Sequence, residues 1–350
     1  MTDTSLLANK TFPGLLLDHA RHSADAPAFR EKYLGIWQTY SWKESAEEVR
    51  ALACGFAAMG LKRGDTVAII GDNRPQLYWV FFAVQSVGAV PVPVYQDGVA
   101  EELQYVLNHA GVCFAVVEDQ EQTDKLLSIK ERCSQLKAII YKDSKGMRAY
   151  DHPFIYNYSD VQERGRGYDM ENPAFFEGEL AASGPDDVAG IFYTSGTTGD
   201  PKGVQLTFSN LLESAELFNL QEALQGNERQ INYAPMAWVG DHFFLALAMS
   251  AGYSSNCPES RETLLTDVKE IGPTIFFGAP ALWEGLLTTI TIRMEDAGRI
   301  KRSLFRYFID VARRTGTDLL DGRRVGLANR LLYWFGEVFI DFLLRVKQFP

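Results

Sequence analysis

Short apolar runs alternate with longer amphipathic stretches along the first part of the chain. The runs have the length and composition of buried strands, and they lie at residues 66–70, 90–94, 113–118 and 138–141. Between them, apolar positions recur at helical spacing, which predicts helices from Ser41 to Gly60, from Asp72 to Gly88, over 99–110 and near 120–134. Strands that alternate with such helices predict an α/β fold with doubly wound, mostly parallel sheets and flanking helices.

Three local signals refine these elements. Ser41 stands directly before a helical pattern and is a candidate N-cap, and Ser209 has the same position before a second helix. The strand at 90–94 contains two prolines, Pro91 and Pro93. Proline cannot donate a backbone hydrogen bond, so we expect this strand at the edge of its sheet or partly unpaired.

The second half of the chain begins after a stretch rich in Gly, Asp, Glu and Pro. This stretch, residues 142–187, is the candidate crossover, and it suggests an N-terminal lobe at 1–180 and a second lobe at 181–350. The pattern that follows predicts strands at 188–192, 204–207, 231–233 and 274–277. Two long helices are expected after residue 299.

Composition limits the possible partners. The 350-residue chain is 46% hydrophobic and has a formal net charge of −11, which argues against nucleic acid as a partner because no basic surplus can displace counterions. The four cysteines have no paired or metal-like spacing and are expected to be reduced thiols. No metal-ligand cluster and no secretion leader is recognised, which favours a cytoplasmic location.

A loop of hydroxyls, glycines and one lysine follows the strand at 188–192. Its glycines let backbone N–H groups approach an anion, and its hydroxyls and lysine add donors and charge. The loop is therefore predicted to bind phosphate through Thr194, Ser195, Gly196, Thr197, Thr198, Gly199 and Lys202. A mobile surface turn is the simpler alternative. A Walker P-loop is excluded because the glycine spacing is too short and Gly203, not Ser or Thr, follows the lysine.

The run from Tyr193 to Val204 resembles the signature loop of the adenylate-forming superfamily, which includes acyl-CoA synthetases. The segments Gly60–Ile69, Gly71–Arg74 and Gly88–Pro93 lie in the order that this family shows. The resemblance implies ATP, Mg²⁺ and CoA as cofactors. It also implies that the loop closes over the β- and γ-phosphates of ATP, with Lys202 and Thr194 in catalytic roles.

Two further segments resemble acyl-pocket motifs of the family. Trp238 occupies a position where many members have histidine, and it could form a wall or gate of an acyl tunnel or simply cap a strand as a core aromatic residue. The segment 267–284 resembles the long-chain fatty acyl-CoA synthetase pattern, which implies substrate contacts at Gly278, Ala279 and Pro280. His242 is expected to be structural.

The last fifty residues contain a basic stretch followed by an apolar run. The run is too short and too interrupted by Glu337 and Asp341 to span a membrane. We expect a packed core helix, with peripheral contact at the inner membrane face as the alternative. By resemblance, the chain covers only the N-terminal part of a family member and is expected to be a fragment.

The sequence thus predicts an AMP-forming fatty acid–CoA ligase with ATP, CoA and a long-chain fatty acid as small-molecule ligands. Activity is expected to need the part of the family pattern that we do not find. Two alternatives stay open at this point: adenylation of an aryl or amino acid, and a non-catalytic nucleotide-binding or interaction fragment.

Overall fold

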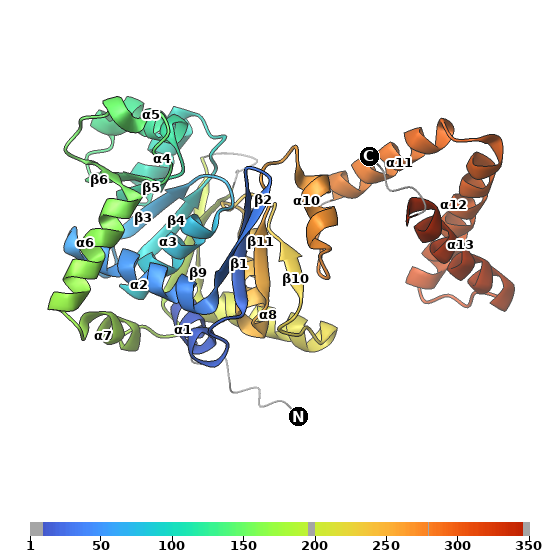
Figure 1. Ribbon diagram of the computed structural model, residues 1–350, viewed down its shortest axis with the longest axis horizontal. Coiled ribbons are helices and arrows are strands. Elements are labelled where there is room, and N and C mark those ends of the chain that lie inside the picture. Colours follow the sequence, from blue (N-terminus) through green and yellow to red (C-terminus); the bar gives the residue numbers. More distant parts are fainter. Residues whose placement is uncertain (1–9, 195–199, 279, 346–350) are drawn as a thin grey trace. The chain divides into compact units, whose positions relative to one another are not determined.

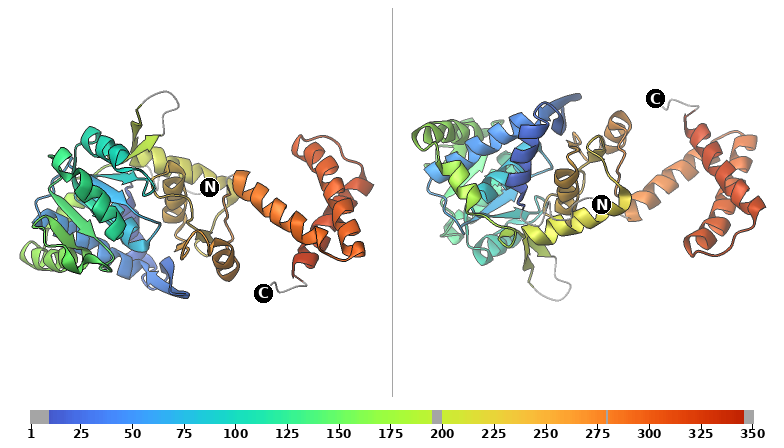
Figure 2. Two further views of the ribbon diagram at one scale, coloured as in Figure 1. Left: turned by 90° about the horizontal axis from the view of Figure 1, so that it is seen from above. Right: turned by 90° about the horizontal axis from the view of Figure 1, so that it is seen from below.

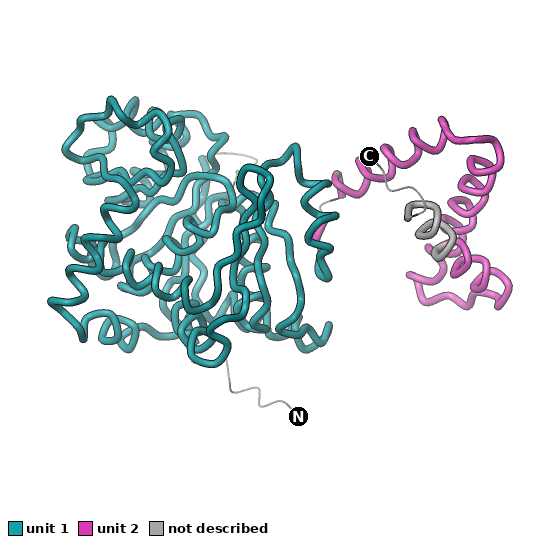
Figure 3. The backbone as a smooth tube through the Cα atoms, in the orientation of Figure 1, with its two compact units in different colours: residues 1–276 teal, residues 277–350 magenta. Residues whose placement is uncertain are grey.

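The protein divides into two compact units, residues 1–276 and 277–350 (Figure 3). The structure is a computed structural model that describes residues 10–194, 200–278 and 280–345, without side chains for residues 281 and 337–345. The unit boundary therefore falls after Phe276. The predicted lobes at 1–180 and 181–350 stay a prediction.

A five-stranded parallel sheet forms the centre of the first unit (Figure 1). Its strands, in spatial order, are β4 (Val90–Val94), β3 (Thr66–Ile70), β5 (Val112–Val117), β6 (Ala138–Tyr141) and β7 (Ile155–Asn157). All four pairings are parallel. The edge position of β4 confirms the expectation from Pro91 and Pro93, since neither residue has an N–H group to donate.

Helices cover both faces of this sheet (Figure 2). Val67 and Ile69 pack in one core cluster with α2 (Trp42–Ala58) and α3 (Pro75–Ser86), whereas Ala68 and Ile70 pack in a second cluster with α4 (Ala100–His109) and α5 (Gln120–Ile129). Alternate residues of β3 thus point to opposite helical layers. This arrangement confirms the predicted doubly wound α/β fold.

Helix α2 begins at a complete capping box. The Ser41 hydroxyl accepts from the Glu44 N–H, and the Glu44 carboxylate accepts from the Ser41 N–H, which confirms the predicted N-cap. The helix packs closely on α6 (Tyr158–Glu171), and a Cβ at Gly165 would lie 1.8 Å from the Ala51 carbonyl oxygen. Only glycine fits at this contact.

A four-stranded sheet lies beside the first sheet (Figure 1). Its strands, in spatial order, are β10 (Arg229–Ile231), β11 (Ser254–Cys257), β1 (Pro27–Tyr33) and β2 (Ile36–Ser41). Strands β10, β11 and β1 run parallel, and β2 returns antiparallel along β1. An N-terminal hairpin therefore completes a sheet whose other strands come more than 180 residues later.

The remaining elements of the first unit surround these sheets. They are α1 (Phe12–His22), η1 (Lys130–Arg132), η2 (Met147–Ala149), α7 (Phe175–Ala181), β8 (Val188–Thr194), β9 (Lys202–Thr207), α8 (Phe208–Glu222), α9 (Val239–Ala251) and α10 (Leu264–Ile271). The predicted crossover at 142–187 thus contains β7 of the first sheet and the helices α6 and α7, both of which contact α2.

Two local predictions in the second half of the chain are wrong. The N-cap of helix α8 is Thr207, not Ser209, because Thr207 and Asn210 form a reciprocal capping box. Residues 274–277 form no strand, and their single ladder contact is an isolated bridge between Gln230 and Ile275. Residues 274–277 are largely apolar, as the prediction requires, but no strand pairs with them along their length.

The second unit is helical over its described residues. It contains α11 (Pro280–Glu295), α12 (Arg299–Leu320) and α13 (Leu327–Arg345), which confirms two long helices after residue 299. Within the described ranges, no helix combines the length and the apolar character that a bilayer span requires.

Candidate active site

The two ends of the predicted phosphate loop lie opposite each other on an antiparallel ribbon. Thr194 is the last residue of β8 and Lys202 the first of β9, and the two are paired in register. Both side chains are exposed. Ser195, Gly196, Thr197, Thr198 and Gly199 lie outside the described residues. The ribbon therefore presents the lysine and one hydroxyl at the base of the loop.

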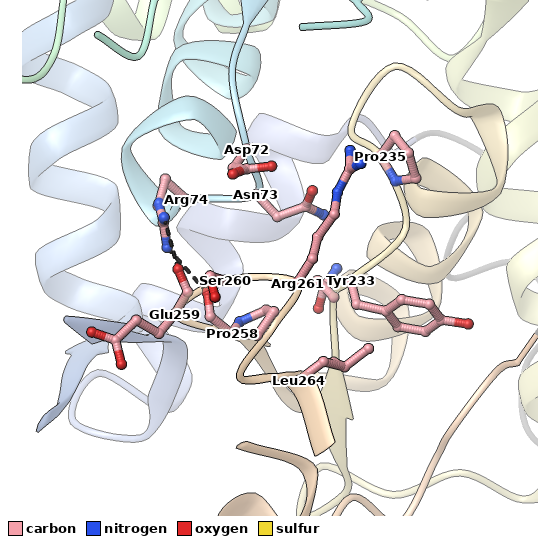
Figure 4. A pocket seen from close by; sticks show the side chains of 11 residues that line it. Asp72, Asn73, Arg74, Tyr233, Pro235, Pro258, Glu259, Ser260, Arg261 and Leu264 are labelled. Carbon is pink, nitrogen blue, oxygen red and sulfur yellow. Dashed lines mark hydrogen bonds between the residues drawn. The ribbon is translucent and has the colours of Figure 1, made fainter. Parts of the chain in front are cut away.

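A pocket of about 220 Å³ opens at the carboxyl ends of three parallel strands (Figure 4). Each of its three lining segments follows a strand directly, namely β3, β10 or β11, so the pocket lies between the two sheets. The lining residues are Asp72, Asn73, Arg74, Asn232, Tyr233, Pro235, Pro258, Glu259, Ser260, Arg261 and Leu264. Open α/β sheets bind ligands at this end of their strands.

Arg74 joins the segments on two sides of this pocket. Its guanidinium donates to the carbonyl oxygens of Pro258 and Glu259, each at 3.0 Å (Figure 4). It also donates to the Glu118 carboxylate at 3.0 Å. All three of its nitrogens are thus used within the protein. We therefore assign Arg74 a structural role, in which it holds the start of α3 against the turn after β11.

A buried carboxylate network lies behind the pocket. The Asp241 carboxylate accepts from the Tyr78 hydroxyl at 2.6 Å and from the side-chain amides of Asn73 at 3.0 Å and Asn232 at 3.4 Å. Burial raises the pKa of Asp241 to about 7, although the three donors oppose this shift. Asn73 and Asn232 also line the pocket, so the network fixes the orientation of two lining amides.

The predicted acyl-pocket residues fall in different units. Trp238 is the N-cap residue of α9 in the first unit, and a Cβ at Gly240 would lie 2.6 Å from its ring. Gly278 and Pro280 belong to the second unit, and Ala279 lies outside the described residues. Trp283 covers Gly278. The Trp283 indole N–H donates to the Gly278 carbonyl oxygen at 2.8 Å, and a Cβ at Gly278 would lie 2.4 Å from the Trp283 Nε1.

His242 has a structural environment, as expected. Its ring is buried between Phe81 and Phe192, with centroid distances of 4.4 and 4.8 Å, and its Nε2 lies 2.8 Å from the Met236 carbonyl oxygen. Burial lowers its pKa to about 4. A neutral imidazole that donates to a carbonyl is therefore part of the core.

The four cysteines are free and buried, which agrees with the expectation of reduced thiols. Burial is the first cause of the raised pKa of each thiol. Within the described ranges, no three His, Cys, Asp or Glu side chains are grouped so that they could hold a metal ion.

Sequence reasoning did not assemble the pocket. The sequence indicates Asn73 and Arg74 only as part of a segment in family-like order, and no local pattern indicates Asn232, Glu259 or Arg261 as site residues. The available signal was that each segment comes directly after a strand. Bringing the three segments together requires the strand order of two sheets, which no local pattern contains.

The paired sheets, the pocket at their carboxyl ends and the loop ribbon define an adenylate-forming α/β fold. The chain belongs to the AMP-binding enzyme family, which matches residues 16–330. The chain is also similar to a solved long-chain-fatty-acid–CoA ligase from Archaeoglobus fulgidus, with a TM-score of 0.68 and 20% identity over 83% of this chain and 54% of that one. An anthranilate CoA ligase in complex with anthranoyl-AMP also gives a TM-score of 0.68, with 19% identity over 80% of this chain and 52% of that one.

Curated relatives share more sequence. A long-chain-fatty-acid–CoA ligase of Xenopus laevis is 26% identical over 346 residues, which are 95% of this chain and 46% of that protein. A long-chain-fatty-acid–CoA ligase of Mycobacterium bovis is 28% identical over 291 residues, or 81% of this chain and 46% of that protein. The chain thus spans about half the length of the curated relatives it matches.

Proposed function

We propose that this chain forms the phosphate-binding part of an ATP-dependent acyl-CoA ligase. A carboxylate oxygen of the substrate attacks the α-phosphorus of ATP, and pyrophosphate leaves with the electrons of the broken P–O bond. The CoA thiol then gives its proton to water, its sulfur forms a bond to the acyl carbon, and AMP leaves with the electrons of the broken acyl C–O bond. The observation that carries the proposal is the ribbon that pairs Thr194 with Lys202 at the base of a hydroxyl- and glycine-rich loop.

Lys202 is the residue to which we assign the largest role. Charge develops on the phosphate oxygens as pyrophosphate leaves, and a fixed cation at that position stabilises it. Thr194 adds a hydroxyl donor on the opposite strand. The positions 195–199 between them would supply backbone N–H groups and hydroxyls of the kind that bind phosphate.

The carboxylic substrate is proposed to be a fatty acid, because the curated relatives bear that name. The pocket of about 220 Å³ is smaller than typical ligand sites of about 300–1,000 Å³. It would hold a short acid or one end of a longer one. We keep Trp238, Gly278, Ala279 and Pro280 as proposed acyl contacts. An aryl or amino acid substrate is the alternative within the family.

Mg²⁺ and CoA are proposed as further ligands of the complete enzyme. Mg²⁺ often binds through substrate phosphates and only one or two carboxylates, so a preformed acidic cluster is not required. This mode fits the described residues, among which no such cluster exists. The ion would shield the phosphate oxygens that Lys202 also neutralises.

The test is fatty-acid-dependent exchange of labelled pyrophosphate into ATP by the chain and by Lys202→Ala. We expect the variant to lose about 10²–10³-fold in rate, as for one preorganised donor. Lys145→Ala is the matched control, because Lys145 is also an exposed lysine of the first unit and should leave the rate unchanged. A loss below about threefold in Lys202→Ala would contradict the assigned role.

A second candidate function is nucleotide binding without turnover. The chain spans about half the length of its relatives, and this fact favours the second candidate. A folded chain that binds ATP but shows no exchange would support it. The ligase reaction would then belong to a longer protein or to an assembly that contains this chain.

A further inference from the structure

Helix α4 contacts the chain on both sides of the phosphate loop, next to Thr194 and next to Lys202. The Tyr105 hydroxyl donates to the Pro201 carbonyl oxygen at 3.2 Å. On the other strand, His109 Nδ1 and the Tyr193 hydroxyl form a hydrogen bond of 2.7 Å. Tyr193 precedes Thr194, and Pro201 precedes Lys202. Helix α4 is therefore hydrogen-bonded to the neighbour of Thr194 and to the neighbour of Lys202.

The two side chains on α4 form a single contact surface. Tyr105 and His109 are four residues apart, so they lie on the same face of the helix. Their rings are stacked, with a centroid distance of 5.4 Å and an interplanar angle of 16°. The His109 ring also meets the edge of Tyr193 at 5.7 Å. Movement of either ring would thus disturb both ends of the phosphate loop.

The ribbon is shaped to receive this contact. Tyr193 is 8% exposed and is paired in register with Gly203. A Cβ at Gly203 would lie 2.9 Å from Ile191 Cγ2 and 3.0 Å from Tyr193 Cζ, so the absence of a side chain makes room for the tyrosine ring. The core cluster of Ile191 and Tyr193 also contains Leu103 of α4, which anchors the helix beside the ribbon.

We infer that Tyr105 and His109 are positioning residues that fix Thr194 and Lys202 at the base of the loop. They act through Pro201 and Tyr193 and do not contact the reacting groups. A fixed orientation of Thr194 and Lys202 reduces the conformational entropy that these two residues lose when a phosphate-bearing ligand binds. The inference rests on the proposed function only for the identity of that ligand.

Trypsin cleavage at Lys202–Gly203 tests the inference without any ligand. Lys202 is the only lysine or arginine between Arg166 and Arg229, so the product is unambiguous. When opening and closing are fast, cleavage follows the population of the locally opened state. We expect Tyr105→Phe and His109→Phe each to raise the cleavage rate at Lys202 by about twofold to tenfold, the effect of one lost hydrogen bond. Cleavage after Arg166 in the same sample should not change.

Tyr150→Phe is the matched control. It also removes a tyrosine hydroxyl of the first unit, one that is bonded to Asp124 and Gln120 and not to the ribbon. Unchanged cleavage at Lys202 in both α4 variants would overturn the inference. So would an equal acceleration at Arg166, because that result means a general loss of stability.

A double variant tests the second contact directly. If His109 and Tyr193 bond to each other, His109→Phe with Tyr193→Phe should accelerate cleavage no more than the stronger single variant. Multiplied effects would contradict the bond. Protection of Lys202 by ATP with Mg²⁺ is measured separately. Its absence in the unmodified chain would count against the proposed function, whereas the inference is decided by the ligand-free rates.

Discussion

The two units of this chain bury apolar surface to very different extents. In the first unit, α3 is apolar around most of its circumference and eleven of its twelve residues are buried. In the described part of the second unit, the buried hydrophobic side chains are Met294 and Phe305. Its exposed large apolar residues are Phe277, Trp283, Leu287, Ile292, Ile300, Leu304, Tyr307, Leu320, Leu327, Leu331, Trp334 and Phe335.

This difference shows what an amphipathic pattern does and does not determine. The spacing predicts a helix in both units, but it does not identify the surface that the apolar face contacts. In the first unit that surface is a sheet of the same unit. In the second unit, the described helices pack on one another, as α12 does on α13, and the side chains named above stay exposed. Lys and Arg outnumber Asp and Glu in residues 277–350, in contrast to the acidic chain as a whole.

A pair of tryptophan variants should show the largest effect. Trp42 is 1% exposed and packs against His19 at a centroid distance of 4.4 Å, whereas Trp334 is 56% exposed. We expect Trp42→Ala to lower the free energy of unfolding by about 3–5 kcal/mol because it leaves a cavity. Trp334→Ala should change it by less than about 0.5 kcal/mol. Urea unfolding curves give both values, and a similar loss in both variants would show that the second unit has a core of its own.

Much of the fold could be predicted because its strongest signals are local. The strand at 66–70 is apolar, short and bounded by turn residues, and the structure has it at the predicted residues. The prolines at 91 and 93 predicted an edge position from the chemistry of one missing N–H group. The prediction at 274–277 was wrong because an apolar run becomes a strand only if a partner strand lies alongside it, and only Ile275 has a ladder partner.

The candidate site could be predicted only in part, for the same reason. The loop from Thr194 to Lys202 is continuous in sequence, so its residue types alone predict that it binds phosphate. The pocket joins the segment after β3 to the segments after β10 and β11, which come more than 150 residues later in the chain. The N-cap of α8 shows that even a local feature can depend on contacts that the sequence does not specify. Thr207 and Ser209 both carry hydroxyls, and the reciprocal hydrogen bond of Asn210 decides between them.

Glycine-to-alanine variants compare helix packing in the two units. At Gly165 in α6, a Cβ would lie 1.8 Å from a backbone oxygen, so alanine must push α6 away from α2. We expect a loss of about 1–3 kcal/mol. At Gly285 in α11, a Cβ meets no atom within 4 Å, and alanine should stabilise the helix by about 0.8–1 kcal/mol.

Gly167→Ala is the control for the first of these variants. Gly167 lies in the same helix, and a Cβ there meets no atom within 4 Å. It should therefore behave like Gly285 and not like Gly165. Thermal unfolding of the three variants gives the comparison. Equal destabilisation by Gly165→Ala and Gly167→Ala would show that the close packing of α2 on α6 is not the cause.

The last comparison concerns pH. Burial raises the pKa of Asp241 to about 7, so the folded chain binds a proton more tightly at this residue than the unfolded chain does. Stability from this group is therefore present at low pH and is lost as pH rises from about 4 to about 7. In the second unit, hydrogen bonds from Arg306 lower the pKa of Glu295, so stability from that pair is lost only as pH falls toward acid.

Asp241→Asn removes the titration while keeping the size of the side chain. We expect the unmodified chain to lose up to about 1.4 kcal/mol per pH unit through this residue between pH 4 and 7. The variant should lack this slope, whatever its stability at a single pH. Urea unfolding at several pH values measures the slope. An equal slope in both proteins would mean that the three donors to Asp241 outweigh its desolvation, and that the carboxylate behind the pocket stays charged throughout this range.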